Sequence, residues 1–192
     1  MKYKTVVIDP PWKISCNLKD KRYYRCGKPM PYKLMTDEEI SKFPINDFAD
    51  SECDLFIWAT HSKLPMALKL LEIWGFKYHC TITWNKTNGI GLNGFRRMTE
   101  MAVYGYRGKM GILRTKGHYI PTLITEKLTI HSVKPQIFYN ILKERSLQPR
   151  IDIFARKKHE GFDAWGDEVS DETQLSLGVR GLEAPVRRRK AE

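Results

Sequence analysis

The residues best suited to chemistry stand together near the start of the chain: Asp9, Pro10, Pro11 and Trp12. The exocyclic amino group of a nucleobase such as adenine is a poor nucleophile, because its lone pair is delocalised into the ring. Two hydrogen-bond acceptors aimed at its N–H bonds, the Asp9 carboxylate and the Pro10 carbonyl, would favour a pyramidal nitrogen, and the proline pair would hold that carbonyl in place. Trp12 offers a face on which an unstacked base can lie. The four residues therefore indicate alkylation of an amino group on a base.

The segment before Asp9 must position this group. Residues 5–8 are β-branched and predict a strand that is covered on both faces. Because two prolines can neither continue a sheet ladder nor enter a helix interior, the strand should end at Asp9, and ligands bind at the carboxyl ends of strands in open α/β sheets. The plain alternative is a strand that ends in a tight turn; the contiguous carboxylate, prolines and aromatic favour a site.

The composition indicates one compact domain with a polyanionic partner. The chain has 192 residues, of which 42% are hydrophobic, and 33 Lys+Arg against 22 Asp+Glu give a net charge of +11. Such an excess of positive charge is typical of proteins that bind nucleic acid. The alternative is an enzyme that is merely basic.

Neither a metal site nor a membrane segment is expected. The four cysteines form no C-x-x-C pair and lie near no His pair at zinc spacing: Cys16, Cys26, Cys53 and Cys80. The N-terminus leads directly into the first predicted strand without a signal-peptide pattern, and no apolar run is long enough to cross a bilayer. We therefore expect a cytoplasmic protein, with the nucleus as the alternative.

The rest of the pattern alternates strands with helices and predicts an α/β fold. Further strands are expected at residues 54–58, 79–84, 101–106 and 150–154, with a short extended piece within 162–169. Helices are expected from the capping box Thr36-Asp37-Glu38-Glu39 to before Pro44, over residues 62–74 up to Gly75, and over residues 132–143. Because only a loop separates 79–84 from 101–106, one strand should be antiparallel in a mostly parallel sheet.

The predicted loops carry further candidates for binding. Residues 89–94 form a formal G-x-G-x-x-G, but no clear helix follows, so we interpret the glycines as flexibility in a gate beside the site, with Arg96 and Arg97 near nucleic acid. Residues 13–33 are basic and rich in tyrosine and suit phosphates and stacked bases, or else form a solvated loop. Residues 1–169 are expected to form the domain and residues 170–192 a basic, disordered tail.

From Tyr3 to Glu168 the motifs resemble the family of the mRNA N6-adenosine methyltransferase catalytic subunit, in a small form similar to prokaryotic and phage members. Asp9-Pro10-Pro11-Trp12 resembles the catalytic tetrapeptide of that family. Supporting matches follow in the family's order: Pro31-Tyr32, Leu55-Phe56-Ile57-Trp58-Ala59-Thr60, Trp84-Asn85-Lys86-Thr87, Tyr104-Gly105-Tyr106-Arg107-Gly108, Ser132-Val133-Lys134-Pro135, Ile153-Phe154-Ala155-Arg156 and Gly161-Phe162-Asp163-Ala164-Trp165-Gly166-Asp167-Glu168.

The resemblance implies a Rossmann-like methyltransferase fold with a permuted motif order, in which the catalytic strand comes early and the cofactor-binding strand late. The cofactor it implies is S-adenosylmethionine, contacted by Asp9, Lys134, Phe154, Arg156, Asp167 and Glu168. The substrate contacts that we assign are Trp12, Tyr32, Lys86, Arg96, Arg97 and Glu100. No metal is required.

The sequence therefore predicts an S-adenosylmethionine-dependent methyltransferase that acts on N6 of adenine in nucleic acid, with DNA favoured over RNA. An RNA adenine-N6 methyltransferase is one alternative. A non-catalytic nucleic-acid-binding subunit of the same fold, suggested by Asp167 where many relatives have Asn, is another. Homo- and hetero-oligomers are both left open.

Overall fold

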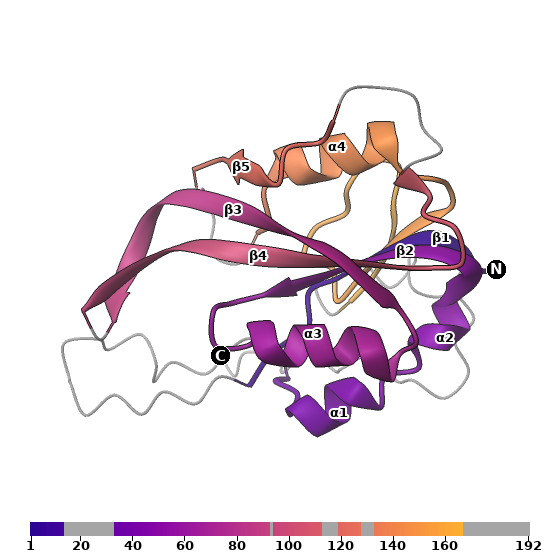
Figure 1. Cartoon of the computed structure of the whole chain (residues 1–192), viewed down its shortest axis with the longest axis horizontal. Coiled ribbons are helices and arrows are strands. Elements are labelled where there is room, and N and C mark those ends of the chain that lie inside the picture. The colour runs from indigo at the N-terminus through magenta and orange to yellow at the C-terminus, as the bar shows by residue number, and fades with distance from the viewer. Residues whose placement is uncertain (14–32, 93, 113–118, 128–132, 167–192) are drawn as a thin grey trace, which may run out of the picture.

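A single mixed sheet organises the computed structural model, which describes residues 1–13, 33–92, 94–112, 119–127 and 133–166 (Figure 1). Its strand order is β5-β3-β4-β2-β1-β6-β7. The strands are β1 (Tyr3–Ile8), β2 (Ala49–Ala59), β3 (Lys77–Leu92), β4 (Phe95–Arg107), β5 (Leu123–Thr125), β6 (Arg150–Ile153) and β7 (Asp163–Trp165). The helices are α1 (Asp37–Ser41), α2 (Ile45–Phe48), α3 (Leu64–Ile73) and α4 (Gln136–Arg145).

The direction of β4 sets it apart within this sheet. It runs antiparallel to both of its neighbours, β2 and β3, whereas the other strand pairs in the described part of the chain are parallel. The prediction of an α/β fold with a mostly parallel sheet and one antiparallel strand is confirmed.

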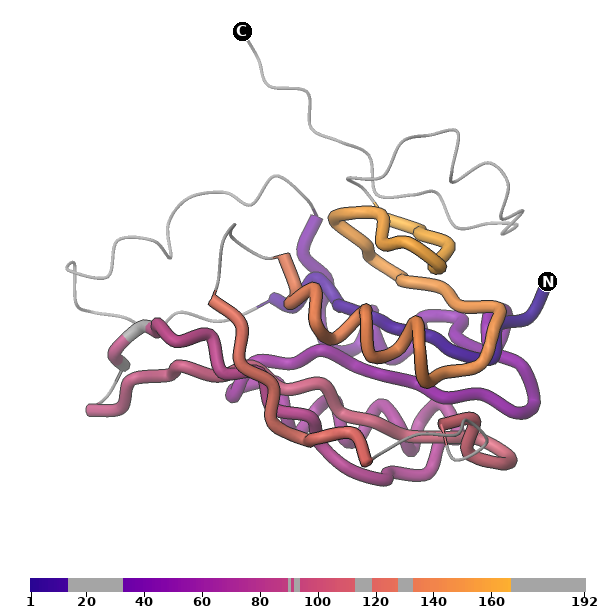
Figure 2. The backbone as a smooth tube through the Cα atoms, turned by 90° about the horizontal axis from the view of Figure 1, so that it is seen from above, coloured from indigo at the N-terminus to yellow at the C-terminus, as the bar shows by residue number. Residues whose placement is uncertain are grey.

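The sheet is covered on both faces, as the β-branched sequence of β1 predicts. Successive side chains of a strand point to opposite faces, so Val6 and Ile8 join one core cluster and Val7 joins another. The first cluster includes Leu70 of α3 and the second Phe138 of α4. Figure 1 accordingly shows α4 on one side of the sheet and α1 and α3 on the other, and Figure 2 looks down on the α4 side.

The helix boundaries follow local signals. Thr36 caps α1, with its side chain accepting from the Glu39 N–H and the Glu39 carboxylate accepting from the Thr36 N–H, which confirms the predicted capping box. Gly75 follows the end of α3 with a φ of +76°, a backbone conformation that glycine adopts without strain. The predicted helix at residues 132–143 is α4, which begins after Pro135. Helix α2 and strand β5 were not predicted.

The prediction of a flexible glycine loop between two short strands is wrong. Strands β3 and β4 continue as a long hairpin, with Ile90 opposite Arg97 and Leu92 opposite Phe95. The reason lies in the glycine at position 89: a Cβ there would lie 2.3 Å from the Arg97 carbonyl oxygen, so the glycine permits a close backbone approach within the hairpin.

Two further expectations concern the C-terminal tail and membrane-spanning segments. The predicted tail at residues 170–192 lies outside the described residues. Among the helices that the structure describes, none is long and apolar enough to cross a membrane.

Candidate active site

The tetrapeptide after β1 is fixed to its surroundings on every side. The Asp9 N–H donates to the Ile153 carbonyl on β6 at 3.2 Å, and the Pro11 carbonyl accepts from the Met35 N–H at 2.8 Å. Trp12 is buried, and its indole Nε1–H donates to the Trp58 carbonyl on β2 at 3.0 Å. The Pro10 carbonyl accepts from the Trp12 N–H at 2.7 Å, which leaves one of its two lone pairs for a ligand.

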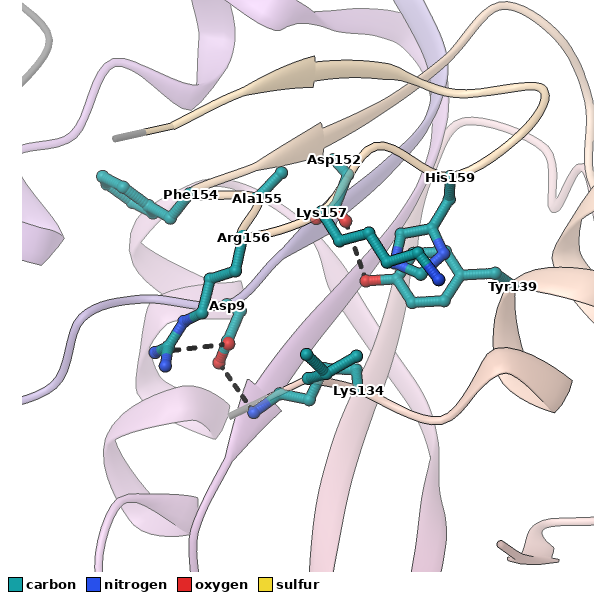
Figure 3. A pocket seen from close by; sticks show the side chains of 10 residues that line it. Asp9, Lys134, Tyr139, Asp152, Phe154, Ala155, Arg156, Lys157 and His159 are labelled. Carbon is teal, nitrogen blue, oxygen red and sulfur yellow. Dashed lines mark hydrogen bonds and ion pairs between the residues drawn. The ribbon is translucent and has the colours of Figure 1, made fainter. Parts of the chain in front are cut away.

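The Asp9 carboxylate lies between two cations. Nζ of Lys134 is 3.0 Å from Oδ1, and Nη2 of Arg156 is 3.7 Å from Oδ2. All three side chains are at most 15% exposed, so water screens these charges only weakly. Figure 3 shows both cations pointing at the same carboxylate from different elements.

Each cation is brought there by a local feature of the chain. Lys134 directly precedes Pro135, the N-cap residue of α4. Arg156 follows β6 after Phe154, which has a φ of +60°, and a left-handed conformation is rare for a bulky residue. The Phe154 ring packs 5.2 Å from Phe43 and 5.4 Å from Trp165 between ring centroids, so aromatic packing holds this turn.

A second carboxylate, Glu100, extends this charged group. Its Oε2 lies 3.1 Å from Lys134 Nζ and its Oε1 lies 3.0 Å from Lys86 Nζ. Burial raises the pKa of Glu100, but the two lysines outweigh that effect and lower the pKa to about 2. Burial lowers the pKa of Lys134, and the Asp9 and Glu100 carboxylates more than compensate, so its pKa is raised. Both groups therefore stay charged at neutral pH.

The reversed direction of β4 is what places Glu100 here. Met101 pairs with Ala59, the last residue of β2, so the early residues of β4 lie at the carboxyl end of β2. A parallel strand would bring its late residues to that end instead. The site thus combines the carboxyl ends of β1, β2 and β6 with the first half of β4.

A cleft opens beside Asp9. Besides Asp9, Lys134 and Arg156, it is lined by Val133, Tyr139, Asp152, Phe154, Ala155, Lys157 and His159 (Figure 3).

A buried polar trio forms the inner wall of this cleft. The Tyr139 hydroxyl donates to Asp152 Oδ2 at 2.8 Å, and its ring stacks on His159 with 3.4 Å between centroids. Burial raises the pKa of Asp152 to about 8, against the opposing effect of the Tyr139 hydrogen bond. Burial, assisted by Lys157, lowers the pKa of His159 to about 4. Asp152 Oδ1 and His159 Nδ1 are buried and have no hydrogen-bond partner among the described residues.

Sequence reasoning missed this trio. An acid between Ile151 and Ile153 in a fully buried strand was the available signal, because an aspartate is rarely fully buried unless it is paired. Tyr139 and His159 carry no comparable sequence signal, since their contact depends on how α4 crosses the sheet.

The other predicted site residues fall into three groups. Asp9, Lys134, Phe154 and Arg156 line the cleft, and Lys86 and Glu100 join its charged network. Arg96 and Arg97 are exposed on the hairpin and do not line the cleft. Tyr32, Asp167 and Glu168 lie outside the described residues.

Comparison with known proteins relates this chain to methyltransferases. The sequence model of the MT-A70 family matches residues 3–168. The chain is 24% identical over 195 residues to the Type II methyltransferase M.MunI of a Mycoplasma species, covering 94% of this chain and 83% of that protein. It is 26% identical over 192 residues to the N(6)-adenosine-methyltransferase MT-A70-like protein of Arabidopsis thaliana, covering 93% of this chain but 25% of that protein. With the human N(6)-adenosine-methyltransferase catalytic subunit METTL3 it shares 31% identity over 87 residues, 45% of this chain and 13% of that protein. The aligned part of the chain thus spans most of the first relative and a quarter or less of the other two.

Proposed function

This chain belongs to the MT-A70 family, and we propose that it transfers a methyl group from S-adenosylmethionine to N6 of adenine in DNA. The observation that carries the proposal is the Asp9 carboxylate, held between Lys134 and Arg156 at the end of β1 and followed by two prolines. Acceptors fixed before the substrate arrives stabilise charge without reorganisation at the moment of reaction.

Several residues of the cleft suit the chemical groups of this cofactor. S-adenosylmethionine supplies an electrophilic methyl group on a cationic sulfur, and it also carries an amino group, a carboxylate and ribose hydroxyls. We assign its carboxylate to Lys134 and Arg156, which suit anions. The unpartnered Asp152 Oδ1 and His159 Nδ1 suit its hydroxyl or amino groups, because buried polar atoms without partners favour a ligand that supplies them. Phe154, Asp167 and Glu168 complete the assigned cofactor contacts.

Asp9 then has a role that depends on its partners. Lys134 and Arg156 pair with Asp9 in the structure; when they bind a carboxylate of the cofactor, Asp9 is released in part and can accept a hydrogen bond from the adenine N6. The second lone pair of the Pro10 carbonyl accepts the other N6–H. Both groups act by position and hydrogen bonding, and no covalent bond between protein and substrate is needed.

The substrate side of the site is assigned to the other predicted residues. Glu100 and Lys86 lie at the open end of the charged network, where they can contact the edge of the adenine. Trp12 and Tyr32 are assigned to the base itself, with Trp12 also fixing the tetrapeptide to β2 through its hydrogen bond to Trp58. Arg96 and Arg97 are assigned to phosphates of the nucleic acid.

DNA is preferred to RNA because the similarity to a Type II methyltransferase covers 94% of this chain and 83% of that protein, whereas the alignments with the two relatives named for adenosine methylation cover 25% and 13% of those proteins. The net charge of +11 suits a polyanion of either kind. RNA remains the second candidate, because several relatives carry the name N(6)-adenosine-methyltransferase.

The test is methyl transfer from isotopically labelled S-adenosylmethionine to matched pools of duplex DNA, single-stranded DNA and RNA. Nucleoside digestion and mass spectrometry then identify the product. We expect labelled N6-methyladenine in a DNA pool. Label in the RNA pool alone would move the assignment to RNA, and no label in any pool, together with no binding of the cofactor, would favour a non-catalytic subunit.

A further inference from the structure

The β3–β4 hairpin ends in an arm, which we define as residues 90–92 and 95–97. In the described part of the chain these residues pair only with each other. The pairing of β2 with β4 ends at Met101, and the pairing of β5 with β3 ends at Asn85. Figure 1 shows the arm reaching beyond all other strands of the sheet. An element two strands wide has no core of its own to bury.

The arm carries an aromatic side chain that the protein does not cover. Phe95 is 78% exposed, and it is followed by the exposed Arg96 and Arg97. Burying a phenylalanine contributes roughly 1.5–3 kcal/mol. A single exposed apolar side chain is common on protein surfaces, but this one stands at the end of a projecting arm and beside two cations. That combination suits a partner with both apolar and anionic surface.

A bulge in β3 connects the arm with the part of the hairpin that lies at the active site. Asn85 pairs with Thr99 and Ile90 pairs with Arg97, so four residues of β3 lie opposite Met98. Within the bulge Thr87 has a φ of +59°, and its N–H donates to Asn85 Oδ1 at 3.0 Å. Bulges bend a hairpin and redirect its side chains. The same bulge aims Lys86 at Glu100, so the direction of the arm and the charged network are fixed together.

We propose that the arm enters double-stranded DNA and that Phe95 inserts between the bases beside the target adenine, in the space left when that adenine leaves the stack. This proposal rests on the proposed function. Phe95 is five strand residues from Glu100, at most about 17 Å at 3.4 Å per residue. Phe95, which we call the wedge, and the charged network around Glu100 can therefore contact one duplex at the same time. The wedge then lies within the base stack, and the target adenine lies outside the stack.

The energetics support this use of Phe95. Unstacking a base step costs a few kcal/mol, and proteins that insert apolar side chains offset this cost with contacts to the deformed duplex. A base must leave the duplex before its amino group can be alkylated inside a protein cleft. Arg96 and Arg97 stand beside the wedge, where cations contact phosphates.

The first experiment compares Phe95→Ala with Tyr78→Ala. Tyr78 is an exposed aromatic at the opposite end of β3, so its removal controls for the loss of a surface ring. Initial rates of methyl transfer are measured on unmethylated genomic DNA as a duplex and on the same DNA after heat denaturation. Phe95→Ala should lose at least about tenfold on the duplex, equivalent to about 1.4 kcal/mol, and change little on single strands. Tyr78→Ala should match wild type on both.

The second experiment needs no catalysis. Permanganate oxidises thymines that have lost their stacking, so a random-sequence duplex pool is treated with permanganate with and without the protein. Wild type should increase thymine oxidation, and Phe95→Ala should not. The proposed insertion of Phe95 would be refuted if Phe95→Ala lost rate equally on duplex and single strands, or if its duplex rate were unchanged. Thymine oxidation that does not depend on Phe95 would also refute it. Oxidation that depends on Phe95, without methylation of any pool by wild type, would support the wedge and refute the proposed function.

Discussion

Asp9 and Glu100 share one cation: Nζ of Lys134 lies 3.0 Å from Oδ1 of Asp9 and 3.1 Å from Oε2 of Glu100. Lys86 contacts the remaining oxygen of Glu100, and Arg156 the remaining oxygen of Asp9. Cations and carboxylates therefore alternate along one largely buried row. A change in any member of this row alters the charge balance of the others.

Replacement of Asp9 should abolish methyl transfer. We expect Asp9→Ala to lower kcat by at least about 10²-fold, the size of effect seen when a positioned polar group is removed from an active site. Binding of S-adenosylmethionine, measured by calorimetry, should stay within severalfold of wild type, because Lys134 and Arg156 remain. Asp47→Ala, at an exposed position, is the control. Wild-type turnover in Asp9→Ala would contradict the mechanism.

The shared cation should appear as coupling in a double-mutant cycle. Lys134→Met leaves the largely buried carboxylates of Asp9 and Glu100 without their shared cation. Breaking a buried ion pair by removing one partner costs about 3–5 kcal/mol. Glu100→Gln removes one of these charges, so the double variant should be more stable than the sum of the single changes predicts. Guanidinium unfolding at pH 7 measures all four proteins. Additivity within about 0.5 kcal/mol would show that the two groups do not interact.

Asp152 should make the protein less stable as the pH rises. Its folded-state pKa of about 8 lies above its unfolded value of about 3.9, so between these values the native state binds more protons than the unfolded state. Stability therefore falls with rising pH over this window. Asp152→Asn keeps an acceptor for Tyr139 and removes this dependence, and relative to wild type it should gain on the order of 3–4 kcal/mol between pH 5 and pH 8. Unfolding at both pH values checks this, with Asp47→Asn as the control; an unchanged difference would refute it.

The bulge makes a prediction that is separate from the Phe95 side chain. A methyl group added by Gly89→Ala would collide with the Arg97 carbonyl and displace the arm, so methylation of duplex DNA should fall while the melting temperature changes little. Gly75→Ala is the control, since a Cβ there meets nothing within 4 Å and introduces only backbone strain. A rate equal to wild type in Gly89→Ala would show that the close approach has no functional consequence.

The sequence predicted those parts of the structure that depend on neighbouring residues. The β-branched run before Asp9, the capping box at Thr36 and the glycine after α3 each act within a few residues, and each is found in the structure. The resemblance to a known family supplied Lys134 and Arg156, which the structure places at Asp9. Their roles toward cofactor and substrate stay predictions.

The parts of the structure that the sequence did not predict depend on contacts between distant segments of the chain. Strand β5 is three residues long and gains its structure from pairing with β3, so it has no periodicity of its own. The hairpin extends through glycines because backbone hydrogen bonds, which need no side chain, form its ladder. The Tyr139–Asp152–His159 contact requires α4, β6 and the following turn together.

The position of β1 between β2 and β6 also has a consequence for folding during synthesis. Thr5 pairs with Asp54 on one side and with Arg150 on the other. Chains are made from the N-terminus, so β1 can pair with β2 early, but one of its edges stays open until β6 emerges from the ribosome. Non-local pairing of this kind slows folding and exposes strand edges meanwhile. The strand that carries Asp9 is therefore made before both of its neighbours and is paired on both edges only once β6 has been made.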